Sequence, residues 1–502
     1  MTKKVSKTNY LIYRECGKNA WVKMHKPDVY YSYPLTEFEE GIIETGNEVD
    51  LVARDLFKGG VLVEGRYDFA LTKELVEKKT PVIYQPAFET EKYQIASDIL
   101  VWNESTQKYD VYEVKASNSG DDKKKKSKNE LYTFDLAFQY MVLKEVGVPV
   151  GQLYLVRLNP EYVRRGDLDL RQLFTKEDFT DRVLEIEELV KNETAVAYDF
   201  LTQEKEPSGN CPCITKGRNS HCTTFLYSNP DIPKYSVHDI SRIGLSKRKL
   251  EELVDGGILN ILDVPDDLKL SDAQKNQIIS AKTGKTMIDE SGIREFLSAL
   301  QYPLAFFDYE TYACAIPRYD GYSPYNQIPF QFSVHIMEEP DGELIHKEFL
   351  FTENKNPDME MIKALQEMIP TKGSVVSWHK SFEIGRNNDL AKRNPEYKKF
   401  IDNLNDRMVD LEDIFKAQFY VHPDFKGKTS IKYALPALVP ELSYKKLEIK
   451  EGGTASNTWN QIVIGGYSKE DSEKQKKNLL EYCKLDTFAM VKIFEHLRDL
   501  VK

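Results

Sequence analysis

The sequence lacks any apolar run long enough to cross a bilayer, which argues against a protein that spans a membrane with helices. Its first residues are basic, but no signal-peptide core follows them, because Arg14, Glu15 and Lys18 interrupt residues 9–21. Without a membrane span or a secretion signal, we expect a cytoplasmic protein.

Cysteine is scarce, with six residues in a chain of 502. So low a content does not build a disulfide framework, and a cytoplasmic location would keep the thiols reduced. Cys314 and Cys483 stand alone in the sequence and are expected to be small apolar residues of the core.

Positive charge is also in short supply, since the net charge is −11. This balance argues against a protein that coats nucleic acid through its overall charge. It does not exclude an enzyme that gathers carboxylates around metal ions and keeps basic residues in local grooves. One local basic run is expected to be a solvated loop. It consists of Lys123, Lys124, Lys125, Lys126 and Lys128.

The chain is long enough for about two to four domains, and its apolar content of 41% is that of a globular protein. Alternating strand and helix patterns predict a multidomain α/β protein. We expect three blocks, namely residues 1–228, a short helical linker at 235–290, and residues 298–502. The expected connectors are residues 207–210, 229–234 and, less clearly, 283–292.

Two strands are legible in the first block, at residues 92–102 and 108–116. If the turn between them is centred between residues 105 and 106, Asp98 lies opposite Glu113, about 5 Å away at Cβ. Lys115 is two residues beyond Glu113 and therefore shares its face. Two carboxylates and an ammonium on one face suit metal-assisted hydrolysis of a phosphodiester, in which the lysine orients water or stabilises charge.

This Asp…Glu-x-Lys pattern, in "IASDILV…YDVYEVKAS", resembles the core of the PD-(D/E)XK nucleases, a restriction-endonuclease-like fold. The RecB-like members take a further metal ligand from an early helix. Here that resemblance implies Asp50 in "ETGNEVDLVARDLF", with Glu44 and Glu48 as rivals. It also implies a role for Gln139 in "YTFDLAFQYMVLKEVG", a helix resembling one that carries a characteristic glutamine in the family.

One early cysteine and three late ones flank this block. Cys16 lies in "YRECGKNAW", and Cys211, Cys213 and Cys222 lie in "CPCITKGRNSHC". The arrangement resembles the iron–sulfur staple of RecB-like exonucleases, including the CRISPR-adaptation exonucleases and AddB. It implies a [4Fe–4S] cluster held by four thiolates. The family usually spaces the second and third cysteines by two residues, and here one residue intervenes. A zinc site with His221 as an extra ligand is the alternative.

The spacing of glycines and leucines in the middle block is typical of a helix-hairpin-helix unit. Gly244 turns the chain, and Leu250 and Leu253 share one helical face. Such units can offer backbone N–H groups and basic side chains to phosphates. The candidates are Lys247, Arg248 and Lys249. A plain helical spacer is the alternative.

A second set of carboxylates follows in the third block. "PLAFFDYET" is an apolar strand that places Asp308 and Glu310 on one face. The amphipathic helix near residues 476–500 places Tyr482 and Asp486 four residues apart on one face. A Val-rich strand, a turn and a helix that carries Glu383 lie between them. Carboxylates from separate elements can hold two Mg²⁺ ions, and a tyrosine hydroxyl can orient the attacking water.

The ordered set resembles the DEDD exonucleases of the ribonuclease H-like 3'–5' exonuclease fold, in the variant whose last motif is Tyr-x-x-x-Asp. Glu383 stands where that family has aspartate, which is a conservative departure from its pattern. Asp410 in "RMVDLEDIF" is a second-tier acid of the same block.

As a whole, the chain resembles a bacterial family of unknown function whose members join a RecB-like nuclease to a ribonuclease H-like exonuclease domain. "FFDYET", "PFQFSVH", "RMVDL" and "YCKLDT" carry most of this resemblance. It implies a Mg²⁺- or Mn²⁺-dependent nuclease with two centres, acting on nucleic acid and favouring DNA from single-stranded ends. The alternatives are a binding or assembly subunit with silent sites, and a ribonuclease. The sequence has no Walker motif, so unwinding would require a separate helicase-type partner in repair or defence.

Overall fold

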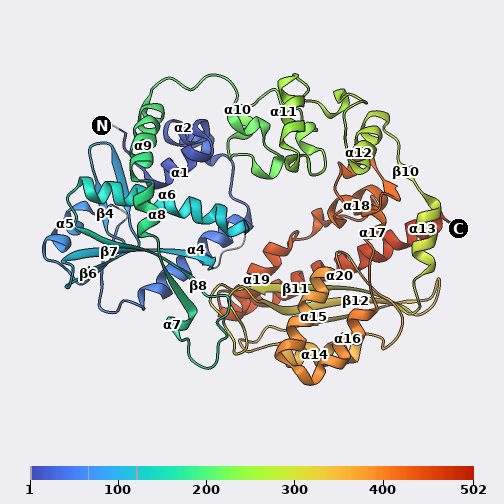
Figure 1. Cartoon of the computed structure of the whole chain (residues 1–502). Helices are drawn as coiled ribbons and strands as arrows, with labels where there is room; N and C mark the ends of the chain where they lie inside the picture. The colour runs from blue at the N-terminus through green and yellow to red at the C-terminus, as the bar shows by residue number, and fades with distance from the viewer. Residues whose placement is uncertain (1–2, 66, 120–122) are drawn as a thin grey trace. The chain divides into compact units, whose positions relative to one another are not determined.

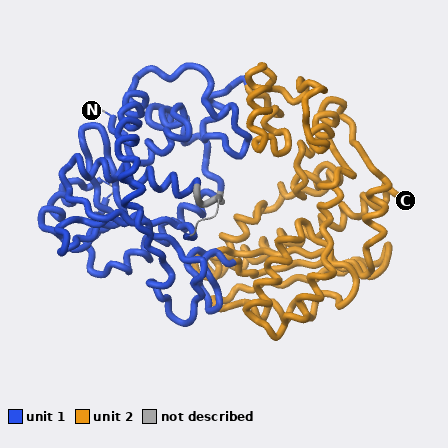
Figure 2. Tube along the Cα trace, in the orientation of Figure 1, with its two compact units in different colours: residues 1–231, 314–326 blue, residues 232–313, 327–502 orange. Residues whose placement is uncertain are grey.

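The computed structural model of the chain describes residues 3–65, 67–119 and 123–502. It divides into two compact units rather than three blocks (Figure 2). Unit 1 consists of Met1–Asp231 and Cys314–Asn326, and unit 2 of Ile232–Ala313 and Gln327–Lys502. The expected linker at 235–290 therefore belongs to unit 2. Residues 314–326, which were expected within the last domain, belong to unit 1.

Unit 1 is built on a mixed sheet of six strands in the order β2-β3-β6-β7-β8-β9. A second, three-stranded sheet has the order β1-β5-β4. The strands of unit 1 are β1 (Val5–Ser6), β2 (Val61–Leu62), β3 (Val82–Tyr84), β4 (Ala87–Glu89), β5 (Tyr93–Ala96), β6 (Ile99–Asn103), β7 (Lys108–Asn118), β8 (Val150–Leu158) and β9 (Phe174–Asp178). Its helices are α1 (Lys7–Glu15), α2 (Gly17–His25), α3 (Pro27–Tyr31), α4 (Glu37–Arg54), α5 (Phe69–Glu77), α6 (Lys123–Glu145), α7 (Leu170–Leu173), α8 (Thr180–Glu185), α9 (Glu187–Thr202) and α10 (Phe225–Ser228).

Helices cover both faces of the six-stranded sheet (Figure 1). Val111 and Leu153 face a core shared with α1, α2, α6 and α9. Tyr112 and Val156 face the opposite core, to which α4 contributes. This alternation is the period-2 pattern of a strand buried on both sides. It sends Glu113 toward α6 and α1, since Glu113 shares the parity of Val111.

The predicted hairpin is observed, with one correction. β6 and β7 pair antiparallel in the predicted register, in which Ile99 lies opposite Tyr112 and Leu100 opposite Val111. However, the expected continuous strand at 92–102 is interrupted at Ser97 and Asp98. Its first half, β5, pairs with β1 and β4 in the other sheet. Alternation along the sequence does not reveal a change of sheet, because both halves are buried on alternate residues.

Unit 2 is built on a sheet of five strands in the order β13-β12-β11-β14-β15, together with a short pair formed by β10 and β16. The strands of unit 2 are β10 (Met287–Ile288), β11 (Leu304–Ala313), β12 (Gln327–Met337), β13 (Leu344–Leu350), β14 (Val375–Ser377), β15 (Met408–Asp410) and β16 (Tyr420–Val421). Its helices are α11 (Lys247–Asp255), α12 (Asp272–Thr283), α13 (Glu290–Ser298), α14 (Asp358–Met368), α15 (Ser381–Arg393), α16 (Lys398–Asp406), α17 (Asp413–Lys416), α18 (Ile431–Leu438), α19 (Gly452–Ile464) and α20 (Lys469–Leu500). The expected connector at 283–292 therefore includes β10.

Strands β13, β12 and β11 form an antiparallel meander, and β14 and β15 add in parallel beyond β11. One face packs on α20 and α18, and the other on α14, α15 and α16 (Figure 1). Phe306 belongs to the α20 side and Phe307 to the other. Asp308 and Glu310 have the parity of Phe306 and therefore face α20.

The middle block forms a small core of its own within unit 2. Leu250 and Leu253 of α11 are buried there, as predicted. Gly257, with φ +72, ends the helix in the left-handed region that glycine favours. None of the helices in the described ranges is long and apolar enough to cross a membrane.

Candidate metal centres

The first centre forms where the break between β5 and β6 meets the middle of β7. Asp98 lies in this break, and its Oδ2 accepts a hydrogen bond of 2.7 Å from the backbone N–H of Val114. Its main-chain oxygen accepts another from the N–H of Gln85 at 2.8 Å. These two hydrogen bonds hold Asp98 against β7. This is the strand that the hairpin register predicted as its neighbour.

Glu113 is deeply enclosed in this centre, with 2% of its surface exposed. Its Oε1 accepts hydrogen bonds from Lys115 at 2.6 Å and Lys7 at 2.8 Å. Both lysines also reach Asp135 of α6, at 2.8 Å from Lys115 and 3.1 Å from Lys7. The result is a square of two buried carboxylates and two half-buried ammonium groups.

Gln139 of α6 holds this square in place. Its Nε2 donates to Glu113 Oε2 at 2.7 Å and to Asp135 Oδ1 at 2.9 Å, while its Oε1 accepts from the Ser97 hydroxyl at 2.7 Å. All the polar atoms of this fully buried amide are therefore satisfied. In these contacts Gln139 acts as a positioning residue for two acids.

Asp50 is the acid of α4 that approaches the centre. The Nε2 of Gln85 lies 3.3 Å from Asp50 Oδ2 and 3.5 Å from Asp98 Oδ1, so one amide links the two carboxylates. Asp50 also pairs with Arg54 at 2.5 Å. Its rivals Glu44 and Glu48 are exposed on the same helix.

Charge sets the protonation of this centre. Burial, followed by the negative charge of Glu113, raises the pKa of Asp98 to about 7. Burial, partly offset by Arg54, also raises the pKa of Asp50. Burial opposes the ionisation of Asp135, but Lys115 and Lys7 outweigh it and hold the pKa of Asp135 well below its ordinary value. Asp98 is thus the acid of this centre that titrates near neutral pH.

The second centre brings together acids from three separate elements of unit 2. They are Asp308 and Glu310 of β11, Glu383 of α15 and Asp486 of α20. Burial comes first, and the charges of Asp486, Glu310 and Glu383 add to it in raising the pKa of Asp308 well above its ordinary value. Burial followed by Asp486 does the same for Glu310. Asp308 and Glu310 lie close together, since a carboxylate oxygen of one is within 4.8 Å of a carboxylate oxygen of the other, and the charges of Asp486 and Glu383 act on both.

Glu383 is 2% exposed, and its Oε2 has no hydrogen-bond partner among the described residues. Burial, opposed by its own backbone N–H and reinforced by Asp410, raises the pKa of Glu383 to about 8. Asp410 is differently placed, because its Oδ1 accepts from the backbone N–H groups of His379 and Glu412 and its Oδ2 from Lys416. Asp410 therefore shapes the turn that leads into α15.

Asp486 and Tyr482 lie one turn apart on α20, as predicted, and both are buried. Burial raises the pKa of Asp486 to about 6, against a hydrogen bond of 2.5 Å from the hydroxyl of Tyr444. The Tyr444 and Tyr482 rings lie 6.2 Å apart. Burial followed by Asp486 raises the pKa of Tyr482, so its hydroxyl stays protonated and can donate.

The four cysteines predicted to act together are adjacent in the structure. The sulfurs of Cys16, Cys211, Cys213 and Cys222 all lie within 4.8 Å of one another. Cys16 lies at the junction of α1 and α2, while the other three lie in the loop between α9 and α10. The cluster can hold a metal ion or an iron–sulfur group.

Several hydrogen bonds lock the loop onto α2 and support the cluster. The Asn19 side chain accepts from the backbone and hydroxyl of Thr224 at 3.1 and 2.9 Å. Asn229 donates to the sulfur of Cys211 at 3.2 Å. His221 instead directs Nε2 at the Lys216 carbonyl, at 3.0 Å, and stacks on Phe225. His221 is not among the grouped ligands, so the histidine of the zinc alternative does not join the cluster here.

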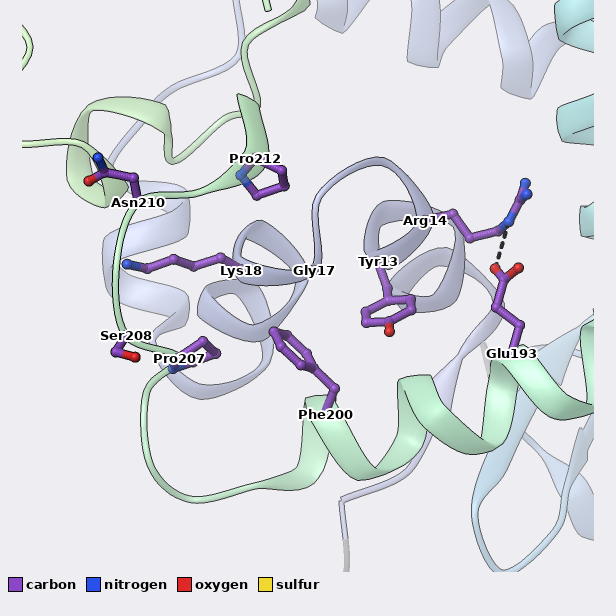
Figure 3. Close-up of a pocket in the computed structure, with 10 residues that line it drawn as sticks. All are labelled: Tyr13, Arg14, Gly17, Lys18, Glu193, Phe200, Pro207, Ser208, Asn210 and Pro212. Atoms are coloured by element: carbon purple, nitrogen blue, oxygen red, sulfur yellow. Dashed lines mark hydrogen bonds and ion pairs between the residues drawn. The ribbon is translucent and has the colours of Figure 1, made fainter. Parts of the chain in front are cut away.

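A hollow of about 580 Å³ is lined by residues of α1, α2, α9 and the loop after α9 (Figure 3). Its lining includes Gly17, next to Cys16, and both neighbours of Cys211, Asn210 and Pro212. Its two cations have internal partners, since Arg14 pairs with Glu193 at 2.7 Å and Lys18 donates to the Gly209 carbonyl at 2.6 Å. These ties join the N-terminal helices to α9 and the cysteine loop.

The structure gives less support to the basic residues that were predicted as possible phosphate contacts. Lys247 and Arg248 are exposed on α11 and pair with Glu251 and Glu252 one turn away, while Lys249 is half-buried. Lys128 is exposed, and the side chains of residues 123–126 lie outside the described part of the chain. No contact in the described chain singles out these residues as a phosphate site.

Four residues of the two centres escaped the sequence analysis, namely Lys7, Gln85, Asp135 and Tyr444. Asp135 had a usable signal, because it precedes Gln139 by one helical turn and must share its face. Lys7, Gln85 and Tyr444 are far in sequence from the groups they contact, and no local spacing points to them.

Comparison with known proteins gives a partial match to a family of unknown function and no activity. The model of a "Domain of unknown function (DUF2779)" matches residues 305–430, a segment that contains Asp308, Glu310 and Glu383. The "Uncharacterized protein MG366" of Mycoplasma genitalium is 26% identical over 217 residues, covering 39% of this chain and 32% of the relative. Its homolog in Mycoplasma pneumoniae is 24% identical over 213 residues, with the same coverage. The matches span about a third of the length of these relatives, and they agree with the expected family of unknown function.

Proposed function

We propose that this chain is a divalent-metal-dependent nuclease with two centres, acting on DNA from single-stranded ends. The observation that carries the proposal is the convergence of Asp308, Glu310, Glu383 and Asp486 in unit 2. These acids come from three elements, and burial together with the charges of Asp486 and Glu383 raises the pKa of Asp308 and Glu310. Buried carboxylates that repel each other destabilise a fold unless a cation offsets them. Two-metal nucleases need such a set.

The strand orders of the two sheets support the proposal. A meander followed by two parallel strands, with acids on the first strand and the last helix, fits a ribonuclease H-like DEDD domain. The hairpin with Asp98 beside Glu113 and Lys115 fits a PD-(D/E)XK core. Fold analogy by itself does not assign chemistry, so the weight rests on the two sets of side chains.

Each centre has residues suited to the reaction. Bound Mg²⁺ or Mn²⁺ would polarise the scissile phosphate and supply hydroxide near neutral pH. In the first centre, Asp50, Asp98 and Glu113 would hold the ion, and the Lys115 ammonium would stabilise charge on the phosphate. In the second, the four acids would hold the ions. The Tyr482 hydroxyl, protonated beside Asp486, would orient the attacking water.

For the cysteines, we propose a [4Fe–4S] cluster that staples the N-terminal helices to the loop after α9. Four thiols within 4.8 Å of one another, without a histidine among them, suit this cofactor. Protein purified without oxygen should be brown and contain about four iron and four sulfide per chain. A colourless protein with one bound zinc would instead establish the alternative.

The test of the nuclease proposal is a cleavage assay with end-labelled DNA and RNA in Mg²⁺ or Mn²⁺. Asp98→Asn and Asp308→Asn disable one centre each. Asp110→Asn and Asp358→Asn are matched controls, since both acids are buried but bound to groups outside the centres. We expect cleavage by the wild type and the controls, and none by the double variant. Equal inactivity of the wild type and the double variant would contradict the proposal.

One observation favours a second function for unit 1. Lys7 and Lys115 already neutralise Glu113 and Asp135, so this centre is nearly balanced without a metal. A balanced centre can bind a nucleic acid strand without cutting it. In that case Asp98→Asn would leave cleavage unchanged while Asp308→Asn abolishes it.

A further inference from the structure

Cys483 occupies an unexpected position in the second centre. It lies on α20 between Tyr482 and Asp486, and its side chain is fully buried. Its sulfur lies 3.8 Å from the main-chain oxygen of Asp308. The sulfur and one carboxylate oxygen each of Asp308 and Glu310 all lie within 4.8 Å of one another. The sequence had suggested an ordinary apolar thiol, and the structure instead places it among acids.

The charges around this group independently favour the binding of a cation. Glu383 contributes to the electrostatics of both Asp308 and Glu310, and its Oε2 is buried without a hydrogen-bond partner in the described chain. A buried carboxylate oxygen without a donor is destabilising unless a positive charge lies beside it. Lys432 attracts Glu310 and Asp486, and Arg386 attracts Glu383 but is itself paired with Asp389 at 2.9 Å. These cations leave the four acids with an excess of negative charge.

We propose that Cys483 is a metal ligand of the second centre, and that this centre prefers a transition-metal dication such as Co²⁺, Fe²⁺ or Zn²⁺ to Mg²⁺. The ion would be held by the Cys483 sulfur with Asp308 and Glu310. Carboxylate oxygens alone suit Mg²⁺, whereas a thiolate shifts preference toward softer ions. This inference rests on the proposed metal-dependent function and names the class of ion that serves it.

Binding at the thiol is a simple exchange. The S–H bond of Cys483 breaks as a bond from sulfur to the metal forms, and the proton leaves to solvent. No electron is transferred, so no oxidant or reductant is needed. Because ligands must lose their protons, binding should release protons and tighten as pH rises.

The test is a Co²⁺ titration of the whole protein, without nucleic acid, followed by the absorption of the cobalt–thiolate bond. The four-cysteine cluster is present in every variant, so the difference between wild type and Cys483→Ser isolates Cys483. We expect this variant to lose part of the thiolate absorption and to bind Co²⁺ about 10–100-fold more weakly. Its affinity for Mg²⁺ should stay within about threefold of the wild type. Cys314→Ser, a buried thiol of unit 1, is the matched control and should behave as wild type.

Asp308→Asn provides a second test that keeps the thiol. It should remove the same portion of the absorption, because the ion loses a co-ligand, and this test does not depend on the folding of Cys483→Ser. Spectra identical to wild type for both variants would overturn the inference. Cleavage with Mg²⁺ but no Cys483-dependent absorption would support the nuclease activity and overturn the role of Cys483 as a metal ligand. Cys483-dependent absorption without any cleavage would support Cys483 as a ligand and overturn the nuclease activity.

Discussion

The two carboxylate centres solve the same electrostatic problem in different ways. In unit 1, Lys7 and Lys115 form ion pairs with Glu113 and Asp135, and Arg54 forms one with Asp50. In unit 2, Asp308 and Glu310 lie close together, burial and the charge of Asp486 raise the pKa of both, and Glu383 Oε2 has no hydrogen-bond partner among the described residues. A centre that carries its own counter-charges is stable without a metal, whereas a centre of clustered acids depends on one. The comparison therefore predicts different responses to metal, mutation and pH.

The largest effect is expected from Lys115→Ala in a background where Asp308→Asn has silenced the second centre. Lys115 provides the positive charge beside the proposed phosphate site of unit 1. Removing such a charge should lower the cleavage rate of the first centre about 100–1,000-fold. The measurement is single-turnover cleavage of end-labelled DNA. Lys144→Ala, a control lysine paired with Glu187, should have no effect. An unchanged rate for Lys115→Ala would mean that unit 1 does not cleave.

Metal should stabilise the two units unequally. An ion that binds only the folded state adds about 2.7 kcal/mol at a concentration 100-fold above its Kd. We expect most of this gain in unit 2, because no ion pair ties its four acids to a lysine or arginine in the described part of the chain. The measurement is backbone amide hydrogen exchange with and without metal. The slowing caused by metal in β11 and α20 of unit 2 is compared with that in β7 and α6 of unit 1. Equal protection of both units by metal would remove the proposed distinction.

Gln139→Leu should weaken metal binding at the first centre about 10–100-fold. The Gln139 amide orients Glu113 and Asp135 and is not itself one of the proposed metal ligands. Loss of such a supporting hydrogen-bond partner weakens metal binding by about this factor. Isothermal titration with Mn²⁺ in the Asp308→Asn background checks it. Gln139→Glu keeps the size and shape of the glutamine side chain but removes its N–H donor, so this variant should also bind Mn²⁺ weakly. Recovery with Gln139→Glu would show that Gln139 only fills space.

The smallest effect is a difference in pH dependence. Asp98, with a pKa of about 7, is protonated below that value and must lose its proton to bind a metal. Affinity at the first centre should therefore rise about tenfold per pH unit up to about 7 and then level off. At the second, Asp486 with a pKa of about 6 and Glu383 with a pKa of about 8 extend the rise to about 8. Coincident profiles, measured by Mn²⁺ titration of Asp98→Asn and Asp308→Asn, would contradict this.

Metal-free unit 2 should also lose stability as pH rises. The folded-state pKa of Glu383 is raised from 4.5 to about 8, so its stabilising contribution is complete below about 4.5 and lost as pH passes through about 8. Glu383→Gln removes this loss and should raise the melting temperature at pH 8 by roughly 2–4 °C, the shift for about 1 kcal/mol. Thermal unfolding in chelator measures it. A lower melting temperature for the variant would show that the carboxylate is stabilised without metal.

Much of the arrangement was fixed by local sequence pattern. Strand alternation and the turn were enough to place Asp98 beside Glu113 and to put Asp308 and Glu310 on one face. The helical period was enough to place Tyr482 one turn from Asp486. These relations hold because neighbouring residues on one regular element, or across one short turn, have geometry set by the backbone alone.

Only the tertiary structure decided how each centre is balanced. Lys7 reaches Glu113 across more than a hundred residues, and Tyr444 reaches Asp486 from a separate loop. The break of the strand at Asp98 and the position of Cys483 among acids also depend on which elements pack together. Burial and long-range contacts control charge, and neither follows from periodicity. The sequence by itself therefore determined which carboxylates meet, and the packing decided that the acids of the first centre pair with cations of this chain, whereas we propose that a metal ion balances those of the second.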